Sequence, residues 1–460
     1  MPYIFNKYHP ARTIVFIIGE GLLIFMSLFL VNCLSKGSSV PLIEILQCMQ
    51  QALVVTITFQ VCLYLFDLYD LRNNWSLVET AVRITQAFGV GCVILSAIYY
   101  FLPLMIISTR VFWSGYFIIY ILVLAWRSIY RYILKYQLFL QSIVIVGTGN
   151  LATDIVKELE DRYDVPYRTL AFIGQEPPGY NPGAVQVIDD IAVLDELVEA
   201  KKIDRIIVAL DDRRGNTPVD LLLNFKLRGV VIEQGVTFYE RLTGKVLAEK
   251  VEPSWIIYSD GFAKGRVKAF FKRSFDLIIS LSLLALSLPI MFLSAIIIKL
   301  ETPGPIFYSQ ERVGMGRRKF SVLKFRSMVQ DAETNGAVWA TANDARVTRF
   351  GQFIRKTRID ELPQLINVIR GEMSMVGPRP ERKVFVEQLK KVIPYYDIRH
   401  EVRPGITGWA QVCYPYGASE EDALRKLEYD LYYMKHISLP LDVLVIFRTI
   451  KTVLFAKGGR

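Results

Sequence analysis

The stretch SFDLIISLSLLALSLPIMFLSAIIIKL, residues 274–300, decides how the C-terminal part of this chain meets its surroundings. It is apolar almost throughout and exceeds the roughly 20 residues that a membrane-spanning helix needs. Pro289 lies in its middle, where a proline removes a backbone donor and kinks a helix. Basic residues flank it on both sides, namely Lys264, Arg266, Lys268, Lys272, Arg273, Lys299, Arg312, Arg317, Arg318 and Lys319. Because Lys and Arg favour the cytoplasmic side of a membrane, we expect a re-entrant hairpin instead of a fifth span.

Other apolar segments lie in the N-terminal region, centred on residues 14–33, 42–65, 87–107 and 111–133. Each is long enough to cross a bilayer. Basic residues gather at one side of these segments: Lys7, Arg12, Arg72, Arg83, Arg127, Arg131 and Lys135. We therefore predict a four-helix transmembrane bundle over residues 1–136, with both ends in the cytoplasm. Glu20 lies inside the first segment, either as a polar contact within the bundle or as a helix-end residue near the interface.

Composition narrows the class of ligand. Hydrophobic residues make up 52% of the chain, the formal net charge is +10 and the pI is about 9.2. A basic, apolar chain favours anionic lipids or phosphorylated substrates over nucleic acid, and no nucleic-acid-binding motif appears. The five cysteines form no CxxC pair and the three histidines are far apart, which indicates neither a disulfide framework nor a zinc site. A bound metal would then be a hard, oxygen-bound cation such as Mg²⁺.

The middle of the chain, residues 141–257, alternates strands with helices and predicts a small Rossmann-like α/β domain with a parallel sheet. The first turn carries Gly147, Gly149 and Ala152 in a GxGxxA pattern, which could seat a pyrophosphate at a helix N-terminus. The acid expected to close the second strand is missing, and Glu176 lies just beyond that position. A nucleotide-binding turn is one interpretation, and a regulatory or dimerising domain is the other.

Two adjacent carboxylates, Asp360 and Glu361, open an apolar helix in the stretch RIDELPQLINVIRGEMSMVGPRP, residues 358–380. One interpretation is helix capping, because Asp favours the N-cap and acids suit the helix dipole. The other is catalysis, because the helix N-terminus and nearby cations should keep both carboxylates ionised, as a nucleophile or a metal ligand must be. The cations exceed what a cap requires: Lys324, Arg326, Arg355, Lys356, Arg358, Arg370 and Arg379.

These cations suit a phosphorylated substrate. Arg355 and Arg379 could bind phosphates with their planar guanidinium groups, and Lys324 and Arg326 add charge from a basic strand. An aspartate can accept a phosphoryl group and pass it on, while Mg²⁺ held partly by Glu361 would screen a diphosphate. Next to a membrane hairpin, such a site would bind a lipid phosphate or a nucleotide-linked donor.

From about Lys268 to its end the chain resembles the bacterial sugar transferases of the monotopic polyprenyl-phosphate phosphoglycosyltransferase superfamily. The resemblance lies in blocks that occur in order: KRSFDLIISLSLLALSLPI, GPIFYSQERVG, FSVLKFRSM, RIDELPQLINVIRGEMSMVGPRP, RHEVRPGITGWAQV and LEYDLYYMKHIS. The N-terminal spans and the α/β region are similar to those of the large members, which initiate exopolysaccharide, capsule or O-antigen assembly. For residues 264–460 the resemblance implies a mainly α catalytic domain with a re-entrant helix at residues 274–300.

The resemblance implies that a sugar-1-phosphate passes from a UDP-sugar to undecaprenyl phosphate, giving undecaprenyl-diphospho-sugar and UMP. Asp360 would carry the sugar phosphate covalently and Glu361 would help to hold Mg²⁺. Substrate contacts are implied for Arg355, Arg379, Arg403, Trp409 and Asp430, with Lys324 and Arg326, although the block around Arg403 could also be only a rigid turn. Members often have a serine before the hairpin proline, whereas Leu288 precedes Pro289 here and Ser287 lies one residue further back.

The resemblance also implies a multi-pass protein of the bacterial inner membrane with a cytoplasmic catalytic domain, and a homodimer through the α/β region is a further expectation. Two other functions remain open. A nonenzymatic membrane scaffold or regulator of polysaccharide assembly would leave the cation-flanked carboxylates unexplained. An NAD-dependent nucleotide-sugar dehydratase could use the GTGNLA turn, but it needs a Tyr-x-x-x-Lys or similar pair, and none follows that turn.

Overall fold

The computed structural model describes residues 3–4, 7–8, 11–37, 41–70, 75–135, 140–161, 165–176, 178–181, 185–190, 193–199, 202–210, 219–250, 265–329, 346–415, 417 and 419–454. The chain divides into two compact units, and the boundary along the sequence lies between Phe238 and Tyr239. The first eight residues are shared between the two units. The predicted domain ends at residues 136 and 257 and the predicted start at residue 264 lie outside the described residues.

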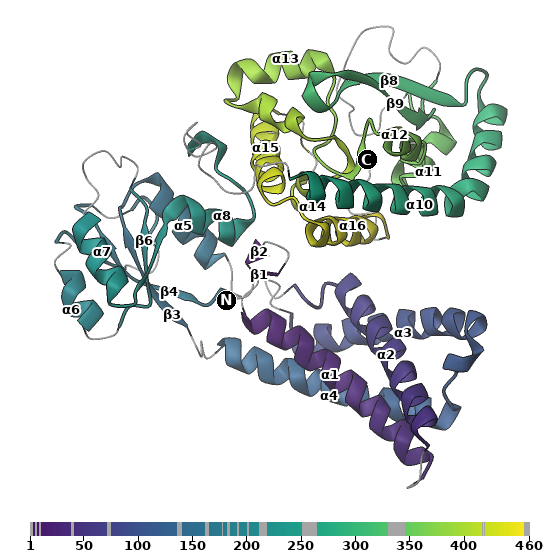
Figure 1. Ribbon diagram of the computed structural model, residues 1–460, viewed down its shortest axis with the longest axis horizontal. Coiled ribbons are helices and arrows are strands. Elements are labelled where there is room, and N and C mark those ends of the chain that lie inside the picture. Colours follow the sequence, from purple (N-terminus) through teal and green to yellow (C-terminus); the bar gives the residue numbers. More distant parts are fainter. Residues whose placement is uncertain are drawn as a thin grey trace. The chain divides into compact units, whose positions relative to one another are not determined.

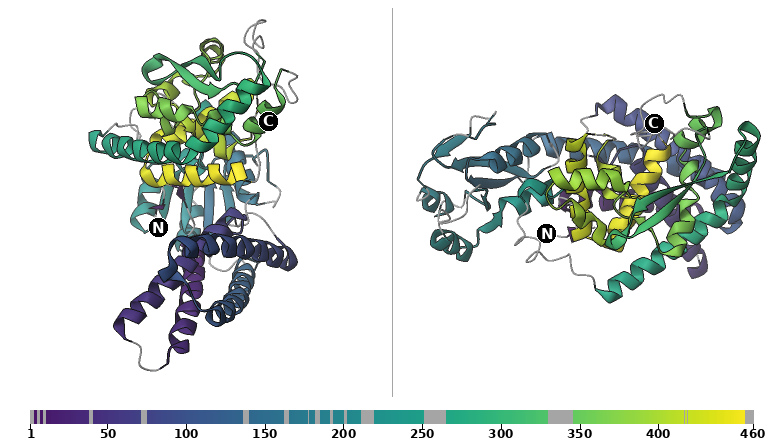
Figure 2. Two further views of the ribbon diagram at one scale, coloured as in Figure 1. Left: turned by 90° about the vertical axis from the view of Figure 1, so that its right-hand side faces the viewer. Right: turned by 90° about the horizontal axis from the view of Figure 1, so that it is seen from above.

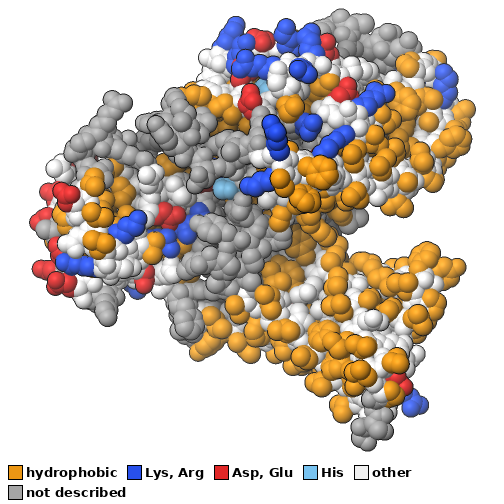
Figure 3. Space-filling view, in the orientation of Figure 1, with side chains coloured by type: hydrophobic (Ala, Val, Ile, Leu, Met, Phe, Trp, Pro, Cys, Tyr) orange, Lys and Arg blue, Asp and Glu red, His pale blue; other side chains and the backbone are white. Residues whose placement is uncertain are grey.

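The N-terminal part consists mainly of long apolar helices. Its elements are β1 (Tyr3–Ile4), β2 (Lys7–Tyr8), α1 (Ala11–Ser35), α2 (Leu42–Leu65), α3 (Leu77–Phe101), η1 (Pro103–Met105) and α4 (Thr109–Lys135). By length and composition, α1, α2, α3 and α4 could each cross a membrane. Hydrophobic side chains cover the surface of these helices in Figure 3, as expected for helices that face lipid. The protein is therefore a membrane protein, as the sequence predicts.

A buried ion pair joins these helices. The guanidinium of Arg127 on α4 lies 2.8 Å and 2.9 Å from the two carboxylate oxygens of Glu20 on α1. Arg127 also donates a hydrogen bond of 2.6 Å to the carbonyl of Leu68, just beyond α2. Of the two interpretations of Glu20, the polar contact within the bundle is the one found.

The α/β part that follows contains a parallel sheet, as predicted. Its strands run in the order β5-β4-β3-β6-β7, and every neighbouring pair is parallel. Numbered from the first strand of the sheet, this order is 3-2-1-4-5, which is the doubly wound Rossmann order without its sixth strand. The elements are β3 (Gln141–Val146), α5 (Asn150–Glu160), β4 (Tyr167–Ile173), β5 (Gln186–Ile188), α6 (Val193–Glu199), β6 (Arg205–Val208), α7 (Val219–Leu227), β7 (Val231–Gln234), α8 (Gly235–Thr243) and η2 (Ala248–Lys250).

The backbone structure explains why glycines occur in the GxGxxA turn. Gly147 has a φ of +114°, which other residues rarely adopt, and a Cβ there would lie 2.5 Å from the carbonyl oxygen of Ala209. Gly149 is the N-cap of α5. The close approach of β3 to the end of β6 therefore explains Gly147 without a ligand.

The segment after α8 belongs to the second unit, although it precedes residue 264. The indole N–H of Trp409 donates to the carbonyl of Gly244 at 2.8 Å. Val246 and Ala248 are buried in the main core of that unit. The structure thus groups residues 239–250 with the C-terminal unit and not with the sheet.

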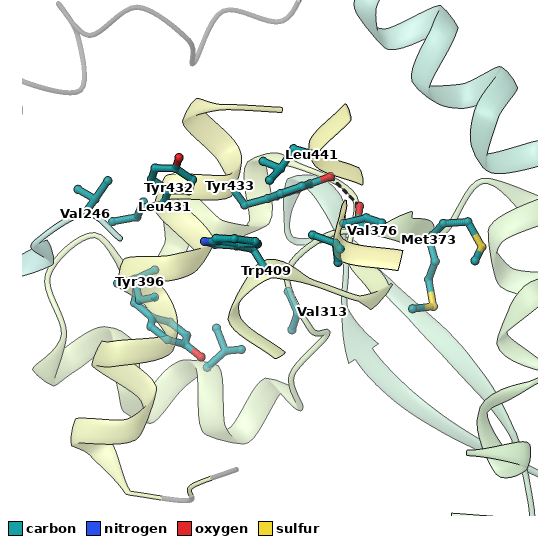
Figure 4. Packing of buried hydrophobic residues seen from close by; sticks show 14 of the residues in the cluster. Val246, Val313, Met373, Val376, Tyr396, Trp409, Leu431, Tyr432, Tyr433 and Leu441 are labelled. Atoms are coloured by element: carbon teal, nitrogen blue, oxygen red, sulfur yellow. Dashed lines mark hydrogen bonds between the residues drawn. The ribbon is translucent and has the colours of Figure 1, made fainter. Parts of the chain in front are cut away.

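The second unit is mainly helical. Its further elements are α10 (Arg266–Glu301), β8 (Phe307–Val313), η3 (Met315–Arg317), β9 (Lys319–Phe325), α11 (Arg349–Lys356), η4 (Ile359–Glu361), α12 (Gln364–Arg370), β10 (Ser374–Val376), α13 (Lys383–Val392), η5 (Tyr396–Glu401), β11 (Gly405–Thr407), α14 (Trp409–Cys413), α15 (Glu420–Lys435) and α16 (Leu439–Leu454). β8 and β9 form an antiparallel hairpin, and β10 pairs with β11 in parallel. Figure 4 shows the core, where Trp409 stacks on Tyr432 and the hydroxyl of Tyr433 donates to the carbonyl of Val376 at 3.0 Å. These contacts hold α14 and α15 against β10.

α10 is one 36-residue helix that contains Pro289. Figure 1 and Figure 2 show its ribbon changing direction along its length. Leu284 lies against the main core of the second unit, and Met291 and Ile298 belong to another hydrophobic cluster of the same unit. Ser287 donates to the carbonyl of Leu284 at 3.2 Å, inside the helix. The structure has one bent helix where the sequence predicts a hairpin, and the re-entrant path stays a prediction.

Candidate active site

Asp360 and Glu361 lie in a short 3-10 turn and not in the first turn of a continuous α-helix. The turn is η4, and α12 begins only after Pro363. Proline has no N–H and so cannot donate back to Ile359 as an α-helix would require. The amide of Leu362 instead bonds to the carbonyl of Ile359 at 3.2 Å, which is the i to i+3 pattern of a 3-10 helix. The predicted position at a helix N-terminus is therefore corrected: the carboxylates precede α12.

Three cations surround the carboxylate of Glu361. Its Oε1 lies 3.0 Å from Nζ of Lys324, 3.0 Å from Nη2 of Arg379 and 3.7 Å from Nη1 of Arg358. Burial acts to raise the pKa of Glu361, but the charges of Lys324, Arg379 and Arg358 outweigh it and hold that pKa far below its ordinary value. Glu361 is therefore ionised at neutral pH, as predicted.

Asp360 behaves differently from its neighbour. Burial, reinforced by the negative charge of Glu361, raises the pKa of Asp360 to about 6, although Lys324, Arg358 and Arg355 act in the opposite direction. Asp360 is thus held ionised less strongly than Glu361, because its desolvation exceeds the effect of the cations, although a pKa of about 6 leaves it mostly ionised at neutral pH. Within the described part of the chain, its Oδ1 is buried and accepts no hydrogen bond. A buried carboxylate oxygen without a partner is available to an incoming group.

A pocket adjoins these carboxylates, since two of its lining residues are the cations that contact Glu361. Its wall consists of Arg312, Val322, Lys324, Gln364, Arg379, Pro380 and Gly405. Three positive side chains around one small pocket suit an anion such as a phosphate.

Arg312 is a charged lining residue that the sequence reasoning missed as a site residue, because it was counted only as a flank of the apolar helix. In the hairpin, Tyr308 faces Lys324 and Arg312 faces Phe320. Since side chains alternate along a strand, Arg312 shares one face with Lys324. That alternation is the signal that could have found it.

Arg355 also belongs to the surroundings of the dyad. It lies on α11, and its Nε donates to the hydroxyl of Ser327 at 2.9 Å. Its charge acts on Asp360. The structure therefore brings Lys324, Arg355 and Arg379 together around Asp360 and Glu361.

Other predicted substrate-binding residues are engaged elsewhere. Arg326 donates to the carbonyls of Pro303 and Thr302 at 2.8 Å each, and so holds the turn after α10. Nε of Arg403 donates to the carbonyl of Gly371 at 3.0 Å, at the end of α12. These hydrogen bonds give both arginines a structural role within the domain.

Trp409 and Asp430 are buried, with side-chain exposures of 0% and 1%. The ring of Trp409 lies in the main core, and its N–H donates to the carbonyl of Gly244. Asp430 lies 2.9 Å from Nη2 of Arg399 in an ion pair. Their burial leaves neither side chain at a surface where a substrate could touch it.

The dyad has the chemistry that Mg²⁺ requires. Within the described residues no group of three or more His, Cys, Asp or Glu side chains could hold a metal ion. Mg²⁺, however, often binds one or two carboxylates together with substrate phosphates. The ionised Glu361 and the unpartnered oxygen of Asp360 fit that pattern.

Comparison with known proteins finds a family model that matches each of two regions of the chain. The sequence model of the bacterial sugar transferase family matches residues 267–456, and that of a CoA-binding domain matches residues 64–233. Over 221 residues the chain is 47% identical to the UDP-N-acetylgalactosamine-undecaprenyl-phosphate N-acetylgalactosaminephosphotransferase of Aeromonas hydrophila, covering 48% of this chain and 52% of the relative.

Two more relatives agree with this. The undecaprenyl-phosphate glucose phosphotransferase of Komagataeibacter xylinus is 33% identical over 69% of this chain and 60% of its own length. The UDP-glucose:undecaprenyl-phosphate glucose-1-phosphate transferase of Caulobacter vibrioides is 40% identical over 40% of this chain and 69% of its own length. The match thus spans about half the length of the Aeromonas and Komagataeibacter proteins. The chain belongs to the bacterial sugar transferase family.

Proposed function

We propose that this protein transfers a sugar-1-phosphate from a UDP-sugar to undecaprenyl phosphate, giving undecaprenyl-diphospho-sugar and UMP. The observation that carries the proposal is a buried aspartate, one oxygen of which accepts no hydrogen bond from the described residues, set beside a glutamate that three cations hold ionised. The names of the relatives support undecaprenyl phosphate as the acceptor. We further propose that the reaction is the first membrane step in making an exopolysaccharide, a capsule or an O-antigen.

In the first step, an oxygen of Asp360 attacks the β-phosphorus of the UDP-sugar. The bond from that phosphorus to the bridging oxygen breaks, and UMP leaves with the electron pair. Asp360 then carries the sugar phosphate as an acyl phosphate. In the second step, the phosphate of undecaprenyl phosphate attacks the same phosphorus, and the carboxylate of Asp360 is released unchanged.

The cations of the pocket supply the electrostatic part of this reaction. Phosphoryl transfer depends on alignment and on neutralising charge more than on covalent machinery. Lys324, Arg379 and Arg312 line the pocket and would hold the phosphate oxygens. Arg355 on α11 adds a positive charge that acts on Asp360. Glu361 would bind Mg²⁺ together with the diphosphate, and the ion when bound would neutralise charge on the departing UMP.

We propose that α10 enters and leaves the bilayer on the same side and that α1 to α4 span it, in the bacterial inner membrane. Contacts of both parts of α10 with the second unit support the re-entrant path, since a straight span would move one part away from that unit. Exposed apolar side chains on α10, such as Leu286 and Phe292, would face lipid. The basic residues at both ends support a cytoplasmic catalytic domain.

The test is an assay of UMP release by the purified full-length protein with undecaprenyl phosphate, Mg²⁺ and a panel of UDP-sugars. The panel includes UDP-glucose and UDP-N-acetylgalactosamine, the sugars in the names of the relatives. We expect release with at least one donor and a trapped adduct on Asp360 when the acceptor is omitted. An adduct on another side chain, or release that survives Asp360→Asn, would refute the mechanism.

A further inference from the structure

The main chain around Arg379 is held by other arginines. Nη2 of Arg399 donates to the carbonyl of Arg379 at 3.1 Å, and Nη1 of Arg312 donates to the carbonyl of Pro380 at 3.2 Å. The amide of Val313 bonds to the carbonyl of Glu381 at 3.0 Å. Successive carbonyls of this segment are therefore each fixed by a donor, the first from η5 and the next two from β8.

The residues just before Arg379 are fixed as well. The amide of Gly377 donates to the carbonyl of Thr407, and the amide of Gly405 donates to the carbonyl of Pro378, each at 2.9 Å. A Cβ on Gly377 would lie 2.4 Å from the carbonyl oxygen of Arg403, so the two chains approach closely. With Pro378 and Pro380 on either side, the backbone at Arg379 has little freedom.

Arg399 is itself held by a buried partner. Its Nη2 lies 2.9 Å from Asp430, and its Nη1 donates to the hydroxyl of Tyr396 at 2.5 Å. Arg399 and Asp430 are 6% and 1% exposed. Such a pair cannot touch a substrate in the pocket, yet one of its members contacts the backbone of a residue that lines the pocket.

We propose that Asp430 and Arg399 are positioning residues for phosphate binding, acting through Arg379. Asp430 holds Arg399, Arg399 holds the carbonyl of Arg379, and the guanidinium of Arg379 thereby reaches Glu361 and the pocket. The side chain of Arg379 is 36% exposed, so the position of its guanidinium depends strongly on the backbone that carries it. The inference rests on the proposed function and assigns a role to an acid that the sequence resemblance had placed at the substrate.

A double-mutant cycle tests this, because two residues that act through one contact lose their effects non-additively. In Asp430→Asn the charge is lost with little change in size, and we expect kcat/KM for the UDP-sugar to fall about tenfold or more. Arg379→Ala should cost more. In the double variant, Asp430→Asn should add nothing to the loss caused by Arg379→Ala.

Glu428→Gln is the matched control, since Glu428 is also buried on α15 and pairs with Arg425 at 3.1 Å. Its effect on kcat/KM should be small and should multiply with that of Arg379→Ala. If Asp430→Asn multiplies with Arg379→Ala in the same way, Asp430 is only structural and the inference falls.

Should Asp430→Asn not fold, Tyr396→Phe removes one hydroxyl contact of Arg399 and keeps the ring. We expect a loss of a few-fold in kcat/KM, again absent in the Arg379→Ala background. Failure of the proposed function would look different: the unmodified protein would release no UMP, or Asp360→Asn would leave release intact.

Discussion

Two buried glutamates, Glu20 in the N-terminal helices and Glu361 in the second unit, meet arginine in opposite ways. Glu20 is matched by one guanidinium, at 2.8 Å and 2.9 Å from its two oxygens, and the third nitrogen of Arg127 donates to the carbonyl of Leu68. Glu361 faces Lys324, Arg358 and Arg379, and two of these cations also line a pocket.

The difference separates a structural ion pair from a binding site. In the helices, one negative and one positive charge neutralise each other. Around the dyad, positive charge exceeds negative charge even when both carboxylates are ionised, and a pocket lies beside them. An anion can complete the second arrangement but not the first.

The largest effect is expected for Asp360→Asn. An amide cannot attack phosphorus as a carboxylate does, so UMP release should fall at least about a thousandfold. Glu20→Gln, which alters the other buried carboxylate, should leave kcat unchanged for the folded protein. Equal losses in both variants, measured by UMP release per folded molecule, would remove the distinction between the two sites.

Arg127→Met should act on stability and not on chemistry. It leaves Glu20 buried without its partner, which costs about 3–5 kcal/mol in comparable pairs. The double variant Glu20→Gln with Arg127→Met should recover much of the loss, and Arg110→Met, at an exposed position, serves as the control. Unfolding of the purified protein in detergent measures the effect, and a double variant as unstable as Arg127→Met alone would contradict the account.

The pH profile sharpens the comparison at the dyad. Because the attacking carboxylate of Asp360 must be ionised and burial raises its pKa to about 6, kcat/KM should fall about tenfold per unit below pH 6. In Glu361→Gln the negative neighbour is gone, so the midpoint should move to lower pH. A midpoint that stays in place, or moves upward, would show that another group controls the profile.

The smallest effect is expected on the free energy of unfolding, which the buried carboxylate of Asp360 lowers. The folded pKa of Asp360 lies above its ordinary value, so the folded state binds the proton more tightly and loses stability as pH rises through about 6. At neutral pH, Asp360→Asn should therefore raise the free energy of unfolding by up to about 3 kcal/mol. This gain in stability should shrink towards pH 4. Thermal unfolding of both proteins at pH 7 and pH 4 measures it, and an equal gain at the two pH values would contradict the prediction.

Features that depend on neighbouring residues were predictable. The apolar helices and the parallel sheet follow from segment length and residue periodicity, and Asp360, Glu361, Arg355 and Arg358 are close in sequence. The 3-10 turn was not predicted, although Pro363, which cannot donate a backbone hydrogen bond, indicated a break before α12. Arg312 was overlooked because its relation to Lys324 depends on the register of a hairpin.

The amino-acid order alone predicted the membrane character, the α/β sheet and the adjacent carboxylates, because each leaves a recognisable residue pattern within short segments. Only the folded chain decided which cations reach Glu361, since Lys324 and Arg379 come from elements 37 and 18 residues away. It also decided that Asp360 has a pKa near 6 and that Asp430 and Trp409 are enclosed. Burial is a property of the whole domain, and desolvation by distant residues outweighs the charges that stand nearby in the sequence.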